Sequence, residues 1–353
     1  MVPLERIRIG VVGLKFGRHI IEKHILEGPA RDFFELAGVC SLDSQETKAA
    51  ALRYSVTPYP NLESMLAERD IQAIALMTGP NGRGELIRKA VRAGKHVMTT
   101  KPFEVDPERG LAALLEARTL GCVVHLNSPS PVPPADLKKI QEWRETFHLG
   151  RAVAAHWRQW VSYREHADGS WYDDAVKCPA APIFRLGIYG INDIVRLFGR
   201  PESVQVLSSR LFTGRPTPDN ATLSIKFTNG ALATVFASCC VNDGKGYSDK
   251  LTLHFENGTV YRNPSPDQDM RSEFTILELA ISRDGSCVIA DRARIPRSEC
   301  SGAYRWDTFY RAVRGEPLVN EISPEHIIDG VRIIDAMRRA ERSGCTVMIP
   351  DRP

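Results

Sequence analysis

The stretch Ile7-Arg8-Ile9-Gly10-Val11-Val12-Gly13-Leu14-Lys15-Phe16-Gly17 opens the chain's first regular pattern. Its first six residues form a short run rich in β-branched side chains, which favours a strand. A turn containing glycine follows, and a helical pattern then continues to about residue 27. A strand, a glycine turn and a helix in this order predict the first βα unit of an α/β fold with a parallel sheet.

The same alternation continues through the first third of the chain. Nearly continuous apolar strands are expected at 34–40, 73–77, 96–99 and 122–126, and helices at 44–54, 85–93 and 107–120. Apolar strands that alternate with helices indicate a parallel sheet buried on both faces. The pattern therefore predicts an N-terminal Rossmann domain.

The segment Ser128-Pro129-Ser130-Pro131-Val132-Pro133-Pro134 interrupts this pattern, because its four prolines can continue neither a helix nor a strand. We expect a dinucleotide-binding domain at 1–127 and a substrate-binding and dimerisation domain at 128–353. Longer alternating strands are expected at 152–163, 203–211, 221–227, 231–238 and 251–255, with late helices at 304–314 and 324–342 that can pack back on the first domain. This predicts an α/β domain with a large, mostly antiparallel open sheet.

Composition narrows the functional classes. The 353 residues carry a net charge of only +3, without a basic run, which disfavours nucleic acid and anionic membranes as partners. No apolar stretch approaches the roughly 18–20 residues of a membrane span. The eight cysteines are scattered without zinc-ligand spacing, so we expect reduced thiols, no metal site and a cytoplasmic protein.

The glycine turn departs from the dinucleotide-binding pattern G-x-G-x-x-G. Gly13 and Gly17 can serve the tight turn and the helix packing, but Lys15 stands at the middle glycine, and the spacing is one residue short. The Lys15 side chain either crowds the phosphates or swings out and pairs with them. Loss of the nucleotide is the alternative interpretation of this turn.

The end of the second strand also lacks the acidic residue that holds a ribose 2′-hydroxyl in NAD-binding proteins. Ser41 stands there, with Asp43 two residues later. A hydroxyl does not repel a 2′-phosphate as a carboxylate does, so this position favours NADP slightly over NAD. No arginine follows directly to support that preference.

Lys101 ends a short apolar strand in Gly94-Lys95-His96-Val97-Met98-Thr99-Thr100-Lys101-Pro102. Pro102 disfavours the helical conformation at Lys101. An ammonium group is thus expected at the carboxyl end of a parallel strand, where open α/β sheets bind ligands. By itself, such a lysine is more often a surface residue in an ordinary strand-to-helix loop.

Three segments together resemble one family, the glucose–fructose oxidoreductase, inositol dehydrogenase and rhizopine-catabolism (Gfo/Idh/MocA) oxidoreductases. The stretch that ends in Lys101-Pro102 is similar to the family's G-K-H-V-x-x-E-K-P. The stretch Arg185-Leu186-Gly187-Ile188-Tyr189-Gly190-Ile191-Asn192 resembles its D-x-G-x-[HY] signature in the tyrosine version. The stretch Gly302-Ala303-Tyr304-Arg305-Trp306-Asp307-Thr308-Phe309 resembles its C-terminal helix.

The resemblance implies a nicotinamide cofactor, a sugar-like substrate and a homodimer or dimer of dimers that is formed through the C-terminal sheet. It implies catalytic roles for Lys101 and Tyr189, a substrate-pocket position for Asn192, and a place under the cofactor for Thr78, Gly79 and Pro80. The other cofactor-binding residues expected are Gly13, Lys15, Phe16, Gly17, Arg18, Ser41, Thr100, Lys101 and Asn127. On one helix, Arg185, Tyr189 and Asn192 would share a face.

Several residues depart from the family pattern. Thr100 replaces the glutamate of E-K-P, Arg185 replaces an aspartate, and Gly84 stands at a frequent histidine. Arginine cannot act as a base, but its planar fork suits carboxylate or phosphate, so we expect an anionic sugar-like substrate. A salt bridge that turns Arg185 away from the pocket is the alternative.

Three interpretations follow from these residues. The first is an NAD(P)-dependent oxidoreductase that acts on CH–OH groups and has Lys101 and Tyr189 at the reacting centre, because a neighbouring ammonium favours the phenolate of a tyrosine. The second is a catalytically impaired family member that binds nucleotide or sugar and regulates a partner. The third is a nucleotide-free interaction protein.

Overall fold

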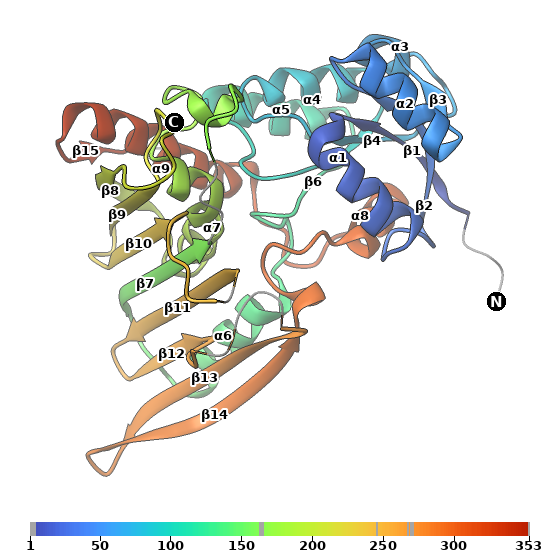
Figure 1. The fold of residues 1–353 in the computed structure, drawn as a ribbon. Coiled ribbons are helices and arrows are strands. Elements are labelled where there is room, and N and C mark those ends of the chain that lie inside the picture. Colours follow the sequence, from blue (N-terminus) through green and yellow to red (C-terminus); the bar gives the residue numbers. More distant parts are fainter. Residues whose placement is uncertain (1–4, 162–165, 245, 267, 269–271, 352–353) are drawn as a thin grey trace. The chain divides into compact units, whose positions relative to one another are not determined.

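The structure, a computed structural model, describes residues 5–351 except 162–165, 245, 267 and 269–271. The chain forms two compact units (Figure 1). The first comprises residues up to Val132 and the segment Tyr304–Pro324, and the second comprises Pro133–Ala303 and the residues from Glu325 onward. The sequence pattern placed the division after residue 127, whereas the contacts place it after Val132 and add a later segment to the first unit.

A six-stranded parallel sheet forms the centre of the first unit. Its strands follow the order β3-β2-β1-β4-β5-β6. They are β1 (Ile7–Val12), β2 (Phe34–Cys40), β3 (Thr57–Pro58), β4 (Ala73–Leu76), β5 (His96–Thr99) and β6 (Val124–Leu126). This is the order of a Rossmann sheet, whose direction of winding reverses beside β1. The predicted Rossmann domain is confirmed.

Helices surround this sheet, because its strands are apolar on both faces. They are α1 (Leu14–Ile20), which continues as the π-helical η1 (Ile21–Leu26), then α2 (Ser44–Tyr54), α3 (Leu62–Leu66), α4 (Arg83–Arg92), α5 (Pro107–Thr119) and α8 (Trp306–Val313). Asp43 and Asp106 cap α2 and α5 by accepting backbone N–H bonds from the first turn.

The late helix α8 belongs to the first unit through its aromatic side chains. Phe34 of β2 lies 5.4 Å from Trp306 and 5.5 Å from Phe309, measured between ring centroids. Trp306 and Phe309 are fully buried in the same core cluster as Ile7 and Phe34. Large aromatic rings buried in this way supply much of the packing energy of a core. The segment therefore docks through its apolar face, as the amphipathic pattern of the helix predicts.

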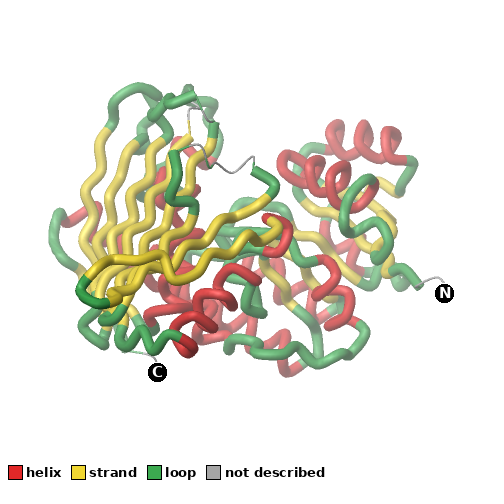
Figure 2. The backbone as a smooth tube through the Cα atoms, turned by 90° about the horizontal axis from the view of Figure 1, so that it is seen from below, coloured by secondary structure: helices red, strands yellow, loops and turns green. Residues whose placement is uncertain are grey.

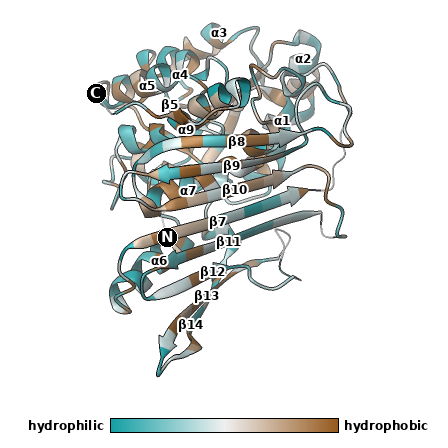
Figure 3. Ribbon diagram, turned by 90° about the vertical axis from the view of Figure 1, so that its left-hand side faces the viewer, coloured by the Kyte–Doolittle hydropathy of each residue, from teal (hydrophilic) through white to brown (hydrophobic). Residues whose placement is uncertain are grey.

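A nine-stranded open sheet forms the second unit, in the order β14-β13-β12-β11-β7-β10-β9-β8-β15 (Figures 2 and 3). Its strands are β7 (Ala152–Val161), β8 (Pro201–Ser209), β9 (Asn220–Phe227), β10 (Leu232–Ser238), β11 (Tyr247–Phe255), β12 (Gly258–Arg262), β13 (Phe274–Arg283), β14 (Ser286–Pro296) and β15 (Val347–Met348). All neighbours pair antiparallel except β7 and β10. The prediction of a mostly antiparallel sheet is confirmed.

One face of this sheet is covered by helices of the same unit, as Figure 3 shows for α6, α7 and α9. The helical segments are α6 (Ala135–Thr146), η2 (Trp171–Asp173), η3 (Ile183–Gly187), α7 (Ile188–Phe198), η4 (Arg297–Glu299) and α9 (Pro324–Ser343). On the covered face Leu223, Val235 and Trp157 are buried. On the opposite face Leu207 and Leu232 remain 74% and 57% exposed.

Three features of this unit differ from the sequence pattern. The long hairpin of β13 and β14 was not expected, because β14 carries charged residues and leaves most of its side chains at least partly exposed. The helix expected from Arg185 onward begins instead as the π-helical η3, which precedes α7. The strand expected at 152–163 ends at Val161, and Tyr163 lies outside the described residues.

Candidate active site

The carboxyl edge of the parallel sheet carries the predicted cofactor residues. Gly13 follows β1 with φ +89°, and its N–H donates to the Cys40 carbonyl at 2.9 Å. A Cβ atom on Gly13 would lie 2.9 Å from the carbonyl carbon and oxygen of Met77, and one on Gly17 would lie 3.0 Å from Val11. Only glycine fits this turn, which is what close approach of backbone to a pyrophosphate demands. The residues present therefore fit a dinucleotide.

Two large side chains of the turn are exposed at this edge. Lys15 is exposed, and Phe16 keeps 43% of its surface in solvent. The Phe16 ring stacks on His19, with the two centroids 5.5 Å apart. Both side chains therefore leave the core of the turn to the two glycines.

Ser41, at the end of β2, belongs to a small polar network. Its hydroxyl donates to Glu46 Oε2 at 2.9 Å, and Glu46 Oε1 accepts from Arg18 Nη2 at 3.0 Å. The Ser41 N–H donates to Thr47 Oγ1 at 3.0 Å. Glu46 lies in the first turn of α2, five residues after Ser41, so the sequence argument about the strand end did not include it. The structure brings a carboxylate and an arginine together there.

Lys101 follows β5 and is anchored through its backbone. The Lys101 N–H donates to Asn127 Oδ1 at 3.0 Å, and Asn127 is buried at the end of β6. The Lys101–Pro102 bond is cis. The adjoining Thr100 is buried, and the side chain of Thr99 donates to the Leu76 carbonyl at 2.8 Å. The predicted residues Thr100, Lys101 and Asn127 thus lie together.

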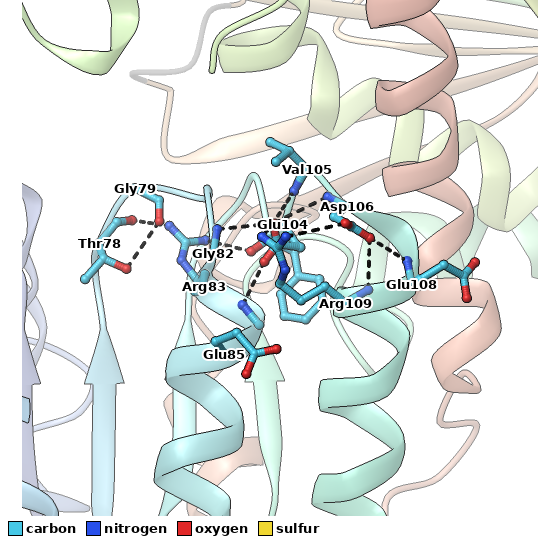
Figure 4. A network of polar contacts seen from close by, with 12 residues as sticks. Thr78, Gly79, Gly82, Arg83, Glu85, Glu104, Val105, Asp106, Glu108 and Arg109 are labelled. Carbon is cyan, nitrogen blue, oxygen red and sulfur yellow. Dashed lines mark hydrogen bonds and ion pairs between the residues drawn. The ribbon is translucent and has the colours of Figure 1, made fainter. Parts of the chain in front are cut away.

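Arg83 is the residue of this edge that sequence reasoning missed. It is the first residue of α4 and is 1% exposed. Its Nη1 donates to the carbonyls of Thr100 and Pro102 at 2.5 Å each, and its Nη2 donates to the Thr78 carbonyl (Figure 4). A basic residue at a helix N-terminus runs against the helix dipole, and this signal could have singled it out.

Three predicted residues of the second unit lie near one another in sequence but contact different neighbours. The Arg185 guanidinium stacks on Tyr172, with Cζ 3.8 Å from the ring centroid. Tyr189 is partly buried, and a Cβ on Gly302 would lie 3.0 Å from its ring. Asn192 is 6% exposed, and its Oδ1 would lie 2.1 Å from a Cβ on Gly330. Glycine at positions 302 and 330 therefore leaves room for the side chains of Tyr189 and Asn192.

Arg185 lines a small pocket within the second unit, whose accessible volume of about 10 Å³ has room for about one water molecule. The other lining residues are Ala181, Thr213, Arg215, Thr217, Pro218, Asp219 and Cys239. Arg215 is ion-paired with Asp173 at 2.6 Å, and Asp219 accepts the N–H groups of Leu211, Phe212 and Thr213. The pocket walls are therefore fixed by polar contacts, which keep its two guanidinium groups in place.

A buried cluster of charged side chains connects α7 with α6 and β12. Arg262 Nη1 lies 2.7 Å from Asp136 and 2.9 Å from Asp193, and Ser301 donates to Asp193. Burial raises the pKa of Asp193 to about 6, although Arg262 opposes this shift. Burial also acts on Arg262, but Asp193, Asp136 and Asp249 hold the pKa of its guanidinium above the usual range. Because Ser301 precedes Gly302, the cluster also anchors the backbone beside Tyr189.

In the part of the chain that the structure describes, no cluster of three histidine, cysteine, aspartate or glutamate side chains is arranged to hold a metal ion. None of the helices described combines the length and apolar character needed to cross a membrane.

Comparison with known families gives two matches that follow each other along the chain. Residues 7–128 match the model described as "Oxidoreductase family, NAD-binding Rossmann fold" (GFO_IDH_MocA). Residues 137–261 match the model described as "GFO/IDH/MocA C-terminal domain". The first covers the six-stranded sheet, and the second covers β7 to β12.

Individual proteins are also similar to this chain, in sequence or in fold. The uncharacterized oxidoreductase C115.03 of Schizosaccharomyces pombe is 30% identical over 163 residues, which are 45% of this chain and 43% of that protein. The chain thus spans less than half of that relative. A putative NADPH-dependent oxidoreductase from Desulfitobacterium hafniense has a TM-score of 0.78 at 14% identity, with 98% of each chain covered. The WlbA dehydrogenase from Bordetella pertussis, in complex with NADH and UDP-GlcNAcA, has a TM-score of 0.72 at 17% identity, with 99% of this chain and 100% of that chain covered. These two likenesses show a shared fold.

Proposed function

The chain belongs to the Gfo/Idh/MocA oxidoreductase family, and from this premise we propose that it is an NAD(P)-dependent oxidoreductase acting on a CH–OH group. The substrate is a sugar-like, anionic molecule. The observation that carries the proposal is the carboxyl edge of the Rossmann sheet, where Gly13 makes the tight turn after β1 with a positive φ and Lys101 is anchored by Asn127. Ligands of such sheets bind at this edge, beside the point where the winding reverses.

The proposed chemistry requires a hydride acceptor and a group that takes the hydroxyl proton. A bound nicotinamide supplies the hydride chemistry. Tyr189 takes the proton of the substrate hydroxyl through its phenolic oxygen, and the Lys101 ammonium stabilises the negative charge that develops on oxygen. The C–H electron pair leaves as hydride and the O–H proton leaves to Tyr189, so the carbinol becomes a carbonyl. The reverse steps reduce a ketone.

The turn and the strand ends supply the cofactor contacts in this proposal. Gly13 and Gly17 let the backbone approach the pyrophosphate, and Lys15 pairs with its charge. The segment Thr78-Gly79-Pro80 passes beneath the cofactor at the end of β4. Phe16 and Thr100 complete the walls.

Cofactor preference is proposed to lie with NADP. Arg18 and Ser41 both contact Glu46 now, at 3.0 and 2.9 Å. A 2′-phosphate at this corner would have to take both donors from Glu46, whose carboxylate otherwise repels it. The greater negative charge and three acceptor oxygens of a phosphate support that exchange. We expect Arg18→Met to weaken NADPH binding about tenfold, which corresponds to ~1.4 kcal/mol, and to leave NADH binding within about twofold. Equal loss for both cofactors in a fluorescence titration would contradict this preference.

Anion recognition is assigned to Arg185. Its guanidinium is held flat against Tyr172 in a pocket that also contains Arg215. A planar fork fixed in this way suits a carboxylate or a phosphate. Hydrogen bonds to charged groups contribute about 1.5–3 kcal/mol. We therefore expect Arg185→Ala to raise the KM for an anionic substrate roughly 10- to 150-fold, and an unchanged KM would reject the assignment.

The deciding experiment has two stages. NADPH and NADH are first titrated against the chain by fluorescence, and the absorbance of reduced nicotinamide is then followed across sugars, sugar acids and nucleotide-linked sugars. We expect turnover with an anionic member of the panel, which Lys101→Met and Tyr189→Phe abolish while cofactor binding persists. Cofactor binding without any turnover would favour the alternative, a catalytically impaired regulatory protein. Absence of cofactor binding would reject both.

The open face of the nine-stranded sheet is proposed to pair with a second copy of the chain. Leu207, Leu232 and Phe236 share the face that the helices leave uncovered, and Leu207 and Leu232 are 74% and 57% exposed. An apolar patch of this kind on a sheet marks an interaction surface. We expect a homodimer in light scattering that Leu232→Lys converts to a monomer. Monomeric wild-type protein at micromolar concentration would contradict this.

A further inference from the structure

One buried guanidinium joins the two loops that carry the cofactor edge. The Nη1 of Arg83 donates to the carbonyls of Thr100 and Pro102 at 2.5 Å each, on the two sides of Lys101. The Nη2 of the same group donates to the Thr78 carbonyl at the end of β4. The planar fork of arginine therefore connects the loop after β4 to the loop after β5 (Figure 4).

A second buried charged residue, Glu104, also connects the loop after β5 to the start of α4. Glu104 is 1% exposed, and its carboxylate accepts from the N–H of Gly84 at 2.8 Å and of Val105 at 2.8 Å. It also lies 3.7 Å from Arg109. A Cβ on Gly84 would lie 2.9 Å from the Arg109 side chain, so glycine is needed for this fit. The loop after β5 is therefore tied to the start of α4 at two places.

Burial alone does not explain an arginine in this position. Burial lowers the pKa of Arg83 to about 10, with Tyr304 and Glu104 acting in the opposite direction, so the group stays charged at neutral pH. Buried charges are weak stabilisers, because desolvation offsets most of their attraction. Its guanidinium instead binds four backbone carbonyls in two loops, those of Thr100, Pro102, Phe103 and Thr78. Contacts of this kind suit a residue that fixes the position of the two loops.

We propose that Arg83 is a positioning residue for Lys101, because it fixes the backbone on both sides of that lysine and aligns it with the loop after β4. The inference rests on the proposed function, in which the Lys101 ammonium acts on the substrate oxygen. A displacement of about 1 Å at a reacting group can lower the rate roughly a hundredfold. Arg83 touches backbone only, so it acts on the reaction through Lys101.

The test separates the positive charge of Arg83 from its planar guanidinium group, which has several N–H donors. Arg83→Lys keeps a buried cation, but a single ammonium cannot reach both loops at once. We expect it to fold and to lose about ten- to a hundredfold in kcat at saturating cofactor and substrate. In Arg83→Ala, we expect added guanidinium to restore turnover at least fivefold. A merely structural arginine would change the melting temperature without this rescue.

Arg88 supplies the matched control. It lies on the same helix, and its side chain is 30% exposed in pairs with Glu85 and Glu116. Exposed pairs contribute little. Arg88→Lys should keep the wild-type kcat, and guanidinium should not activate Arg88→Ala. A folded Arg83→Lys protein with wild-type kcat, or Arg83→Ala without rescue, would overturn the proposal.

Hydrogen exchange on the wild-type chain covers the case in which no Arg83 variant folds. The Lys101 N–H is bonded to Asn127, so its exchange does not report on Arg83. The guanidinium protons of Arg83 do report on it, because they donate to carbonyls of both loops. If Arg83 holds the loops, these protons should exchange at least a hundredfold more slowly than those of the exposed Arg292, and equal exchange would refute the proposal. This measurement needs no turnover. A wild-type chain that binds no nicotinamide would reject the proposed function, and slow exchange at Arg83 would still support the clamp.

Discussion

Removal of the Arg262 side chain is expected to destabilise the second unit strongly. Arg262 is 3% exposed and pairs with Asp136 and Asp193, which are 0% and 3% exposed. Arg262→Met keeps most of the volume but leaves two buried carboxylates without their cation. Loss of one partner from a buried pair costs about 3–5 kcal/mol. For a unit of this size, each kcal/mol shifts the melting temperature by about 2–4 °C, so the expected loss is about 6–20 °C.

The destabilisation should depend on pH, with a sign that follows from Asp193. Burial raises the pKa of this carboxyl to about 6 even with Arg262 beside it, and removal of Arg262 raises the pKa further. In the unfolded chain the pKa is ~3.9. A carboxyl that holds its proton more tightly when folded contributes stability below the unfolded pKa and loses it as pH rises through the folded pKa. Arg262→Met should therefore be more damaging at pH 8 than at pH 5.

Urea unfolding at the two pH values, followed by tryptophan fluorescence, measures this effect. Trp157 is a suitable reporter, because the Arg262 guanidinium lies 4.6 Å from its ring centroid. Arg292→Met is the matched control, since Arg292 is 67% exposed in its pair with Glu278 and should contribute less than ~1 kcal/mol. The double variant Arg262→Met, Asp193→Asn should recover part of the loss. A loss below ~1 kcal/mol at pH 8 would refute the reasoning about the cluster.

Three further outcomes are expected. Gly13→Ala should lower stability by ~1–3 kcal/mol and weaken NAD(P)H binding at least tenfold, because the new Cβ meets the Met77 backbone at 2.9 Å. Gly94→Ala is the control, since Gly94 has φ +73° but no atom within 4 Å of the new Cβ. It should cost only ~1–2 kcal/mol and leave cofactor binding unchanged. Burial lowers the pKa of His125 to about 4. The stability that His125 contributes is therefore full above the unfolded pKa and is lost, by up to ~3 kcal/mol, as pH falls from 6.5 to 4. His125→Gln should make the free energy of unfolding less dependent on pH over this range. Asp219→Asn should cost ~1–3 kcal/mol in urea melts, because the carboxylate accepts the N–H groups of Leu211, Phe212 and Thr213; an unchanged midpoint would contradict its role in the pocket wall.

Much of the fold could be predicted because it depends on local patterns. Apolar strands that alternate with helices allow few arrangements other than a parallel sheet, and the residues at strand ends then lie along one edge. Ser41, Lys101 and Asn127 were placed at that edge for this reason. The antiparallel second sheet was likewise visible in alternating strands. The hairpin of β13 and β14 was not, because its outer strand buries few side chains.

The helix that carries Tyr189 begins differently from the sequence prediction. A regular helix would align Arg185, Tyr189 and Asn192 on one face. In the structure the π-helical η3 precedes α7, Arg185 stacks on Tyr172, and Asn192 approaches Gly330. A π-helical turn is rare, so a helical repeat in the sequence does not predict one.

The sequence by itself determined the class of fold, the order of the elements and the positions that require glycine or carry the candidate reacting groups. Tertiary structure alone decided the partners of the buried charges. Arg83 contacts backbone carbonyls, and every residue has one, so no pattern of side chains could point to those contacts. Arg262 finds Asp136 and Asp193 from distant segments. Long-range charge pairing depends on the completed packing, because only burial makes an unpaired charge costly enough to select its partner.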